Sequence, residues 1–173
     1  DKTESDMLEA LGNMFLIGCL CTDFKNRLMW SHYADSHKGF CIEYDYSELY
    51  VDDHTTLPLP VIYSEERPLI SWKAAFDNST ENLEEAVAQF TKGLLTKDSI
   101  WSYENEWRIL FPNSFLDENY NYNTPKIKRI FFGVNVTEKK YNSLVKKIKK
   151  YDNTIECIKL KLNYKKYELE KEE

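Results

Sequence analysis

Residues 28–45 read LMWSHYADSHKGFCIEYD, and we expect the rest of the chain to fold around this stretch. Its first half is rich in residues that favour helices, so it predicts a short helix. Gly39 interrupts that pattern. From Phe40 to Asp45 apolar and polar side chains alternate, which is the periodicity of a strand. A helix–turn–strand corner carrying histidine, tyrosine and carboxylate side chains can place polar groups at the rim of a sheet. The same residues also fit an ordinary aromatic core corner.

Length and composition are typical of one folded domain. The chain has 173 residues, of which 42% are hydrophobic and 30% charged, and this is enough to bury a core. The longest apolar run, near residues 14–20, is too short to cross a membrane, and we find no pattern of a signal peptide. We therefore expect a cytoplasmic protein without a membrane partner.

The cysteines and histidines show no metal-binding spacing. Cys19-x-Cys21 is too tight for the paired ligands of a zinc site, and on a strand both side chains would share one face as small apolar groups. His32, His37 and His54 do not fit an HExxH motif or a similar one. We therefore predict free thiols, a reducing compartment and no metal.

Charge is distributed unevenly along the chain. The net charge of −6 combines −13 in residues 1–125 with +7 in residues 126–173. A basic C-terminal helix and strand, residues 137–169, would attract nucleic acid or an acidic partner. A solvated, lysine-rich helix face would give the same pattern. The lysines concerned are Lys139, Lys140, Lys146, Lys147, Lys149 and Lys150.

Hydrophobic periodicity predicts strands interrupted by two main helices. One helix is expected from Ser79 or Thr80 to about Leu95, and Thr137 is expected to cap the other. Strands are expected at residues 14–22 (buried), 40–45, 57–64 (an edge strand containing two prolines), 106–111, 126–132, 154–162 and 164–169. Residues 1–173 would then form a single α+β domain. Its central twisted sheet would be mostly antiparallel, with about five to seven strands and flanking helices.

A second dense segment, residues 97–111, reads KDSIWSYENEWRILF. On a strand, Glu104, Glu106 and Arg108 would share one face. Two carboxylates and an arginine are costly to bury unless they bind one another or a ligand. Three aromatic side chains of the segment surround these charges, and an aromatic-walled polar site suits a nucleotide-sized ligand. An exposed Glu–Arg ladder on a sheet is the alternative explanation.

These segments resemble the signature of a bacterial family catalogued as domain of unknown function 2971. The resembling blocks are LMWSHYAD with HKG in residues 28–39, Lys97 with WxYExEWR in residues 101–108, and IFFG in residues 130–133. The resemblance covers about residues 14–136. Members of the family usually begin with a Lys-Tyr-Arg-like strand and an Asn-Asp-Pro-like turn. Neither is visible here, so if that segment helps to form the site, this chain is an incomplete version of it.

Glu104-x-Glu106 at the start of a strand is also similar to the acidic motif of ADP-ribosyltransferases. These enzymes cleave the nicotinamide–ribose bond of NAD through an oxocarbenium-like state, as in glycoside hydrolysis. The similarity implies NAD as co-substrate, no metal, and a nucleic acid or protein acceptor. It makes Glu106 the catalytic carboxylate, while Glu104 orients the acceptor and His32 holds the ribose. The remaining contacts to the cofactor would come from Tyr33 and Trp101 as stacking walls, Tyr103, Arg108 as a brace or phosphate contact, and Lys97 as a group that neutralises phosphate.

Two other functions fit the same residues. A non-catalytic module would bind a nucleotide through the same pocket without turning it over. A nucleic-acid-binding protein would use the lysines of residues 139–150, and its binding would weaken steeply with salt. The transferase reading implies a toxin or phage-defence effector, and it can coexist with nucleic-acid binding because a transferase could modify a nucleic acid held by the lysines.

Overall fold

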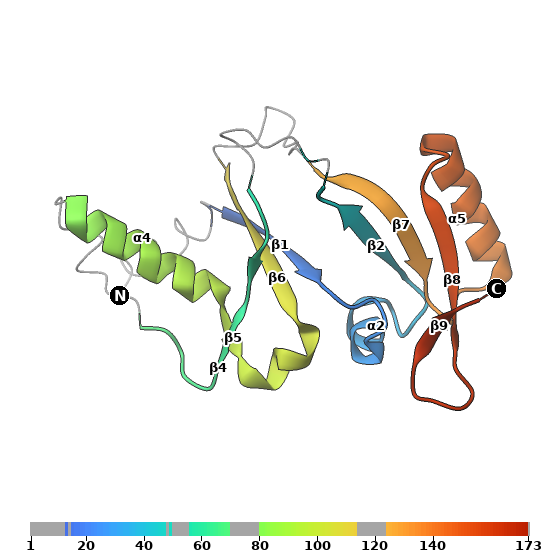
Figure 1. Ribbon diagram of the computed structural model, residues 1–173, viewed down its shortest axis with the longest axis horizontal. Coiled ribbons are helices and arrows are strands. Elements are labelled where there is room, and N and C mark those ends of the chain that lie inside the picture. Colours follow the sequence, from blue (N-terminus) through green and yellow to red (C-terminus); the bar gives the residue numbers. More distant parts are fainter. Residues whose placement is uncertain are drawn as a thin grey trace. The chain divides into compact units, whose positions relative to one another are not determined.

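The computed structural model describes residues 13, 15–47, 49, 56–69, 80–113 and 124–172. The chain forms two compact units, and each contains segments that are distant in sequence. Unit 1 consists of residues 1–22 and 56–120, and unit 2 of residues 23–55 and 121–173. The fold is α+β, as predicted, with mostly antiparallel strands in the described residues (Figure 1).

Unit 1 contains a three-stranded antiparallel sheet in the order β1-β6-β3. The elements of the unit are β1 (Phe15–Cys21), β3 (Leu59–Pro60), β4 (Ile62–Ser64), α4 (Thr80–Leu95), β5 (Thr96–Asp98), η1 (Ser99–Glu104) and β6 (Glu106–Pro112). The single edge strand predicted for residues 57–64 is divided in two: β3 lies at the edge of this sheet, as its proline suggests, but β4 belongs to another sheet. Strands β4 and β5 form a separate parallel pair.

Two of the predicted elements of unit 1, α4 and β1, form within one residue of the expected bounds. Helix α4 ends at Leu95 as predicted, and Ser79, one of its two predicted caps, lies outside the described residues. Strand β1 forms where a buried strand was predicted, but the prediction of burial is wrong. The side chains of Leu16 and Ile17 are both exposed. A continuous apolar run does not by itself show that both faces of a strand are covered.

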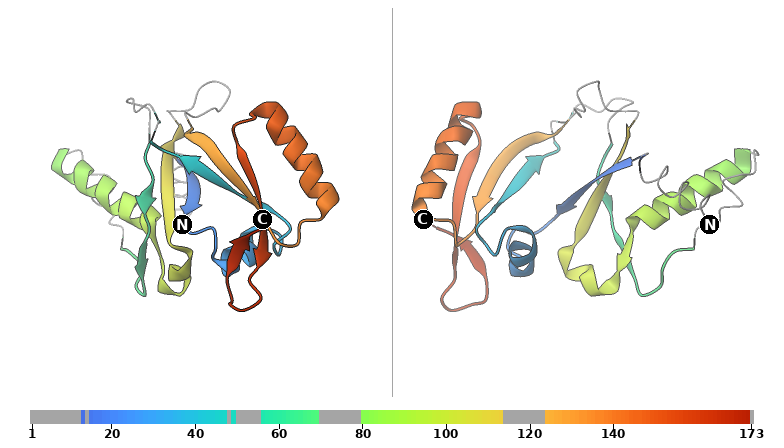
Figure 2. Two further views of the ribbon diagram at one scale, coloured as in Figure 1. Left: turned by 45° about the vertical axis from the view of Figure 1, so that its right-hand side comes forward. Right: turned by 180° about the vertical axis from the view of Figure 1, so that it is seen from behind.

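Unit 2 is built on a four-stranded sheet in the order β2-β7-β8-β9. Its elements are α2 (Arg27–Tyr33), β2 (Phe40–Asp45), β7 (Lys126–Phe132), α5 (Glu138–Tyr151), β8 (Glu156–Leu162) and β9 (Leu169–Lys171). Strands β7 and β8 are parallel, and the other pairs are antiparallel. Helix α5 makes the crossover between the parallel strands (Figure 2).

Successive residues of β7 point to opposite faces of this sheet and form two hydrophobic clusters. Phe131 packs with Trp30 of α2 on one face. Ile130 and Phe132 pack with the apolar side of α5 on the other face. Thr137 accepts a hydrogen bond from the backbone N of Lys140, so the predicted cap of α5 is confirmed.

The corner of residues 28–45 is a packed structural element. Trp30 is 3% exposed, and its Nε1 donates a 2.6 Å hydrogen bond to the carbonyl oxygen of Phe24. The turn after α2 is made by Asp35, Ser36 and His37, which all have positive φ angles. Gly39 follows because a Cβ there would lie 3.0 Å from the Cα of Ala34. For Trp30, the aromatic core corner is therefore the correct reading.

The last predicted strand, residues 164–169, is wrong in position. Residues 163–168 form a turn, and β9 runs from Leu169 to Lys171. Asn163 stabilises that turn by accepting hydrogen bonds from the backbone N of Lys165 and Lys166. No helix in the described part of the chain is long and apolar enough to cross a membrane.

Candidate functional site

Four charged side chains meet in unit 1. Lys97 lies on β5, Glu104 ends η1, and Glu106 and Arg108 lie on β6. The two glutamates are almost completely buried, with exposed fractions of 3% and 5%. Buried charges of this kind require direct partners.

The backbone between the two glutamates explains how they come together. Asn105 adopts a left-handed conformation with φ 44° and ψ 50°, which asparagine tolerates better than most residues. Glu104 is therefore at the end of a 3-10 helix, and its predicted place on the strand is wrong. Glu106 begins β6, where its backbone N donates a 2.8 Å hydrogen bond to the hydroxyl of Tyr63. Both carboxylates still reach the same lysine.

Each charge in the cluster has an opposite charge beside it. The Nζ atom of Lys97 donates to Glu104 and, at 2.9 Å, to Oε2 of Glu106. Arg108 donates from Nε to Oε1 of Glu106 at 2.9 Å and from Nη2 to Oε2 at 3.2 Å. Its Nη1 donates to the carbonyl oxygen of Leu94, which ties the end of α4 to β6. Two cations and two carboxylates thus form one neutral, hydrogen-bonded group.

These contacts keep Glu106 ionised. Burial by itself would raise the pKa of Glu106, but hydrogen bonds from Arg108, Cys19 and Lys97 outweigh it and lower the pKa to about 2. Burial would lower the pKa of Lys97, but its two carboxylate partners raise it above the usual value. At neutral pH the cluster therefore holds a buried carboxylate in its charged form.

Cys19 joins the cluster from the neighbouring strand, and sequence analysis missed it. It is the register partner of Arg108 across β1 and β6, and its thiol is hydrogen-bonded to Glu106. Cys19 is exposed by surface area, but partial desolvation of its thiol, followed by this bond and the negative charge of Glu106, raises the pKa of Cys19 to about 11. The strand period alone grouped Cys19 with Cys21 as apolar side chains. Only the β1–β6 register shows that Cys19 faces charged groups.

Aromatic side chains adjoin the cluster on one side. The Nζ atom of Lys97 lies 5.3 Å from the ring centroid of Trp101, a cation–π distance. The rings of Trp101 and Tyr103 lie 6.0 Å apart. Trp101 is 37% exposed, so part of its ring is open to a ligand. Trp107 points to the opposite face of β6 from Glu106.

The chain matches the family described as Protein of unknown function (DUF2971) over residues 29–109. This match supports the family resemblance expected from the first two sequence blocks. The matched segment contains both the corner at Trp30 and the cluster around Glu106. No curated protein and no solved structure matches the chain.

Two predicted site residues of the DUF2971 segment, His32 and Tyr33, belong to unit 2. They lie at the end of α2, their side chains are exposed, and their rings are 6.3 Å apart. The candidate site is therefore built here from unit 1 alone. It contains Lys97, Glu104, Glu106 and Arg108, with Trp101 and Tyr103 beside them, and it adds Cys19.

The six lysines predicted to bind nucleic acid differ in their contacts within the chain. Lys140 donates to the carbonyl oxygen of Lys38, and Lys149 donates to those of Asn153 and Ile155. These two ammonium groups hold α5 against its surroundings. The other four, at positions 139, 146, 147 and 150, are exposed, and no ion pair to them occurs within the described residues.

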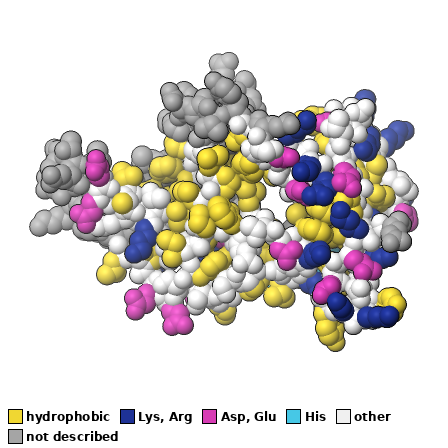
Figure 3. Space-filling model, in the orientation of Figure 1, with side chains coloured by type: hydrophobic (Ala, Val, Ile, Leu, Met, Phe, Trp, Pro, Cys, Tyr) yellow, Lys and Arg dark blue, Asp and Glu magenta, His cyan; other side chains and the backbone are white. Residues whose placement is uncertain are grey.

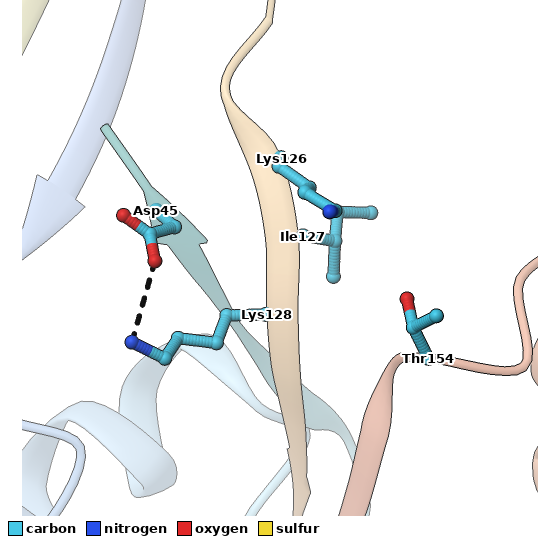
Figure 4. A pocket seen from close by; sticks show the side chains of 5 residues that line it. All are labelled: Asp45, Lys126, Ile127, Lys128 and Thr154. Atoms are coloured by element: carbon cyan, nitrogen blue, oxygen red, sulfur yellow. Dashed lines mark hydrogen bonds and ion pairs between the residues drawn. The ribbon is translucent and has the colours of Figure 1, made fainter. Parts of the chain in front are cut away.

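None of the predicted site residues lines the pocket of unit 2 that Figure 4 shows. It is lined by Asp45, Lys126, Ile127, Lys128 and Thr154. Lys128 and Asp45 form an ion pair of 3.3 Å across it. Among the residues whose positions are described, no group of histidine, cysteine, aspartate and glutamate side chains is arranged to hold a metal ion.

Proposed function

We propose that unit 1 carries an ADP-ribosyltransferase-like site that cleaves the nicotinamide–ribose bond of NAD, with Glu106 as the catalytic carboxylate. The observation that carries this proposal is a buried, ionised carboxylate at the start of a strand, beside a partly exposed tryptophan. A carboxylate that is held in a fixed position and shielded from water stabilises positive charge that develops on a substrate.

The reaction places its positive charge on the ribose. The C1′–N bond breaks, and its electron pair leaves with nicotinamide, which becomes neutral. The ribose ring becomes oxocarbenium-like and is attacked by a nucleophile of the acceptor, which loses its proton. Glu106 would accept a hydrogen bond from a ribose hydroxyl and stabilise the cationic ring. Trp101 and Tyr103 would stack against the departing nicotinamide.

Lys97 occupies the position that the ribose needs. Its ammonium bonds to Oε2 of Glu106, and a ribose hydroxyl would replace it there. The sequence similarity implies that Glu104 orients the acceptor, but in this arrangement Glu104 has a different role. Because its carboxylate is buried and bonded to Lys97, it anchors the displaced ammonium. Arg108 keeps its two hydrogen bonds and holds Glu106 in place.

The test is release of nicotinamide from NAD by the full chain, with nucleic acid and cell extract as possible acceptors. The Glu106→Gln variant is expected to lose at least 100-fold in rate, since losing one electrostatic contact in a site typically costs about 10²–10³. Glu43→Gln is the matched control, because Glu43 is also a strand glutamate paired with an arginine, Arg129. Full activity of Glu106→Gln would overturn the proposal.

Two further variants test the roles that sequence analysis gives to unit 2. His32→Ala and Tyr33→Ala are expected to raise the KM for NAD if the imidazole holds the ribose and the phenol ring stacks. Unchanged KM values would restrict the site to unit 1. Expression in bacteria tests the proposed toxin or defence role, because growth should slow with the parent chain and recover with Glu106→Gln.

A non-catalytic nucleotide-binding module is the second candidate, and one observation favours it. Both oxygens of Glu106 already have hydrogen-bond donors within the chain. Such a module would bind NAD or another nucleotide and release no nicotinamide. Its Glu106→Gln variant, in which Lys97 is still present, would bind the nucleotide as tightly as the parent chain. Calorimetric titration with NAD beside the release assay separates these two functions.

A further inference from the structure

The turn between β8 and β9 presents two tyrosines and two lysines on a fixed backbone. Residues 163–168 read NYKKYE. Asn163 closes the turn, because its backbone N donates to the carbonyl oxygen of Glu168 at 2.9 Å. Its side chain also accepts bonds of 2.8 and 2.9 Å from the backbone N of Lys165 and Lys166. Three hydrogen bonds of Asn163 therefore stabilise the backbone of this turn.

The aromatic rings of this turn are open to solvent. Tyr164 is 87% exposed and Tyr167 is 92% exposed. They lie on either side of Lys165 and Lys166 in sequence, and the Nζ atom of Lys165 lies 5.4 Å from the Tyr164 ring centroid. Figure 3 shows lysine and arginine side chains next to exposed hydrophobic ones over this hairpin. Rings and cations thus form one exposed surface.

Arg27, at the start of α2, adds a third cation beside this turn. Its guanidinium carbon lies 5.6 Å from the centroid of the Tyr167 ring. Its Nε atom is buried, and among the residues that the structure describes it has no hydrogen-bond partner. Nδ1 of His37 is also buried without a hydrogen-bond partner among the described residues. Burial and the positive charge of Arg27 lower the pKa of His37. A guanidinium carries several N–H donors in a planar fork and can form charge-assisted hydrogen bonds to a phosphate.

We propose that this surface, made of Arg27, Tyr164, Lys165, Lys166 and Tyr167, binds single-stranded nucleic acid. Exposed tyrosines offer flat faces on which unpaired bases stack, and the three cations contact the phosphates between them. The charge of the C-terminal part supports this partner, because residues 126–173 carry 14 lysines and arginines against 7 acidic residues. Duplex nucleic acid would not expose its bases to the rings. This inference is independent of the proposed NAD chemistry.

The test is fluorescence anisotropy of labelled 20-nucleotide DNA and RNA single strands with the full chain. Tyr164→Ala and Tyr167→Ala are each expected to weaken binding roughly 5- to 150-fold, the usual range for one stacked base. Arg27→Ala should lower the salt slope by about 0.7, the value for one phosphate contact on a single strand. The matched control is Tyr151→Ala, because Tyr151 is a tyrosine on α5 that is 83% exposed.

Several results would overturn the proposal. One is unchanged binding by both tyrosine variants. Another is loss of binding in Lys146→Glu/Lys150→Glu, which would place the interface on α5. A third is duplex binding as tight as single-strand binding, and a fourth is pelleting with anionic vesicles but no binding to oligonucleotides. Circular dichroism of Arg27→Ala checks that its effect does not arise from unfolding, and Arg27→Lys, which keeps the charge, is the conservative control.

Discussion

The Nζ atom of Lys97 lies 2.9 Å from Oε2 of Glu106, so the carboxylate proposed to act on NAD is bound by a cation of its own chain. Glu104 holds the same ammonium from the end of η1. Lys97 is therefore both a structural partner of two buried carboxylates and a competitor for one of them. The first role predicts that a variant without the ammonium is less stable, and the second predicts that it binds NAD more tightly.

Replacing Lys97 with methionine separates stability from binding. The change leaves Glu104 buried without its cation, and we expect a loss of roughly 2–4 kcal/mol in the free energy of unfolding, because Lys97 is only partly exposed. The affinity for NAD should rise in the folded fraction, since Oε2 of Glu106 becomes free. Denaturant unfolding and calorimetry measure the two effects. Lys92→Met, at an exposed position on α4, should change neither.

The decrease in the free energy of unfolding at acid pH should depend on Glu106. Its pKa in the folded state is about 2, below the ordinary value of 4.5. Folding therefore favours the ionised form, and this contribution is fully present above pH 4.5 and is lost as the pH falls toward 2. In Glu106→Gln the contribution is absent, so its unfolding free energy should vary less with pH in that interval. Urea unfolding at successive pH values checks this, with Glu43→Gln retaining the steeper dependence.

Cys19 should react slowly with alkylating reagents. Its pKa of about 11 leaves little thiolate near neutral pH. In a chain whose other cysteines are changed to serine, Glu106→Gln removes an acceptor and a negative charge beside the thiol. The pKa of Cys19 should then fall, and iodoacetamide should react faster, by about tenfold for each unit of change. Equal rates in the two proteins would show that Glu106 does not control this thiol.

Gly133 should tolerate no side chain. A Cβ at this position would lie 2.1 Å from the carbonyl oxygen of His37, a backbone atom of the turn that follows α2. Gly133→Ala must push that turn away from β7, and we expect a loss of at least about 1–3 kcal/mol in stability. Gly18→Ala on β1 is the control, because the atoms nearest its Cβ belong to side chains and not to the backbone, the first being in the Phe111 ring at 3.2 Å. Thermal unfolding should show the larger decrease in Tm for Gly133→Ala.

Much of the local structure could be predicted from single segments. Strand β7 has its predicted bounds, and Thr137 caps α5 as its side chain and the following periodicity indicate. The corner that carries Trp30 also forms as a helix followed by a strand. In these segments the local preferences agree with the fold, so a window of about ten residues contains the necessary information.

The candidate site could be predicted only in part. The charges at Glu106 and Arg108 were found from their place on one strand face, but Glu104 was assigned to that strand because a left-handed Asn105 leaves no clear pattern in sequence. Cys19 was missed because its contact depends on the pairing of β1 with β6, 89 residues away in sequence. The strand predicted at residues 164–169 falls largely on the exposed turn of residues 163–168.

The sequence by itself determined the helices, most strands and the two segments that carry the family resemblance, because periodicity and capping are properties of neighbouring residues. Tertiary structure decided which strands pair, in which register, and therefore which charges meet. It brought Lys97 between two glutamates and Cys19 beside them. A strand's period states which side chains share a face, but only pairing with a distant strand decides what that face contacts.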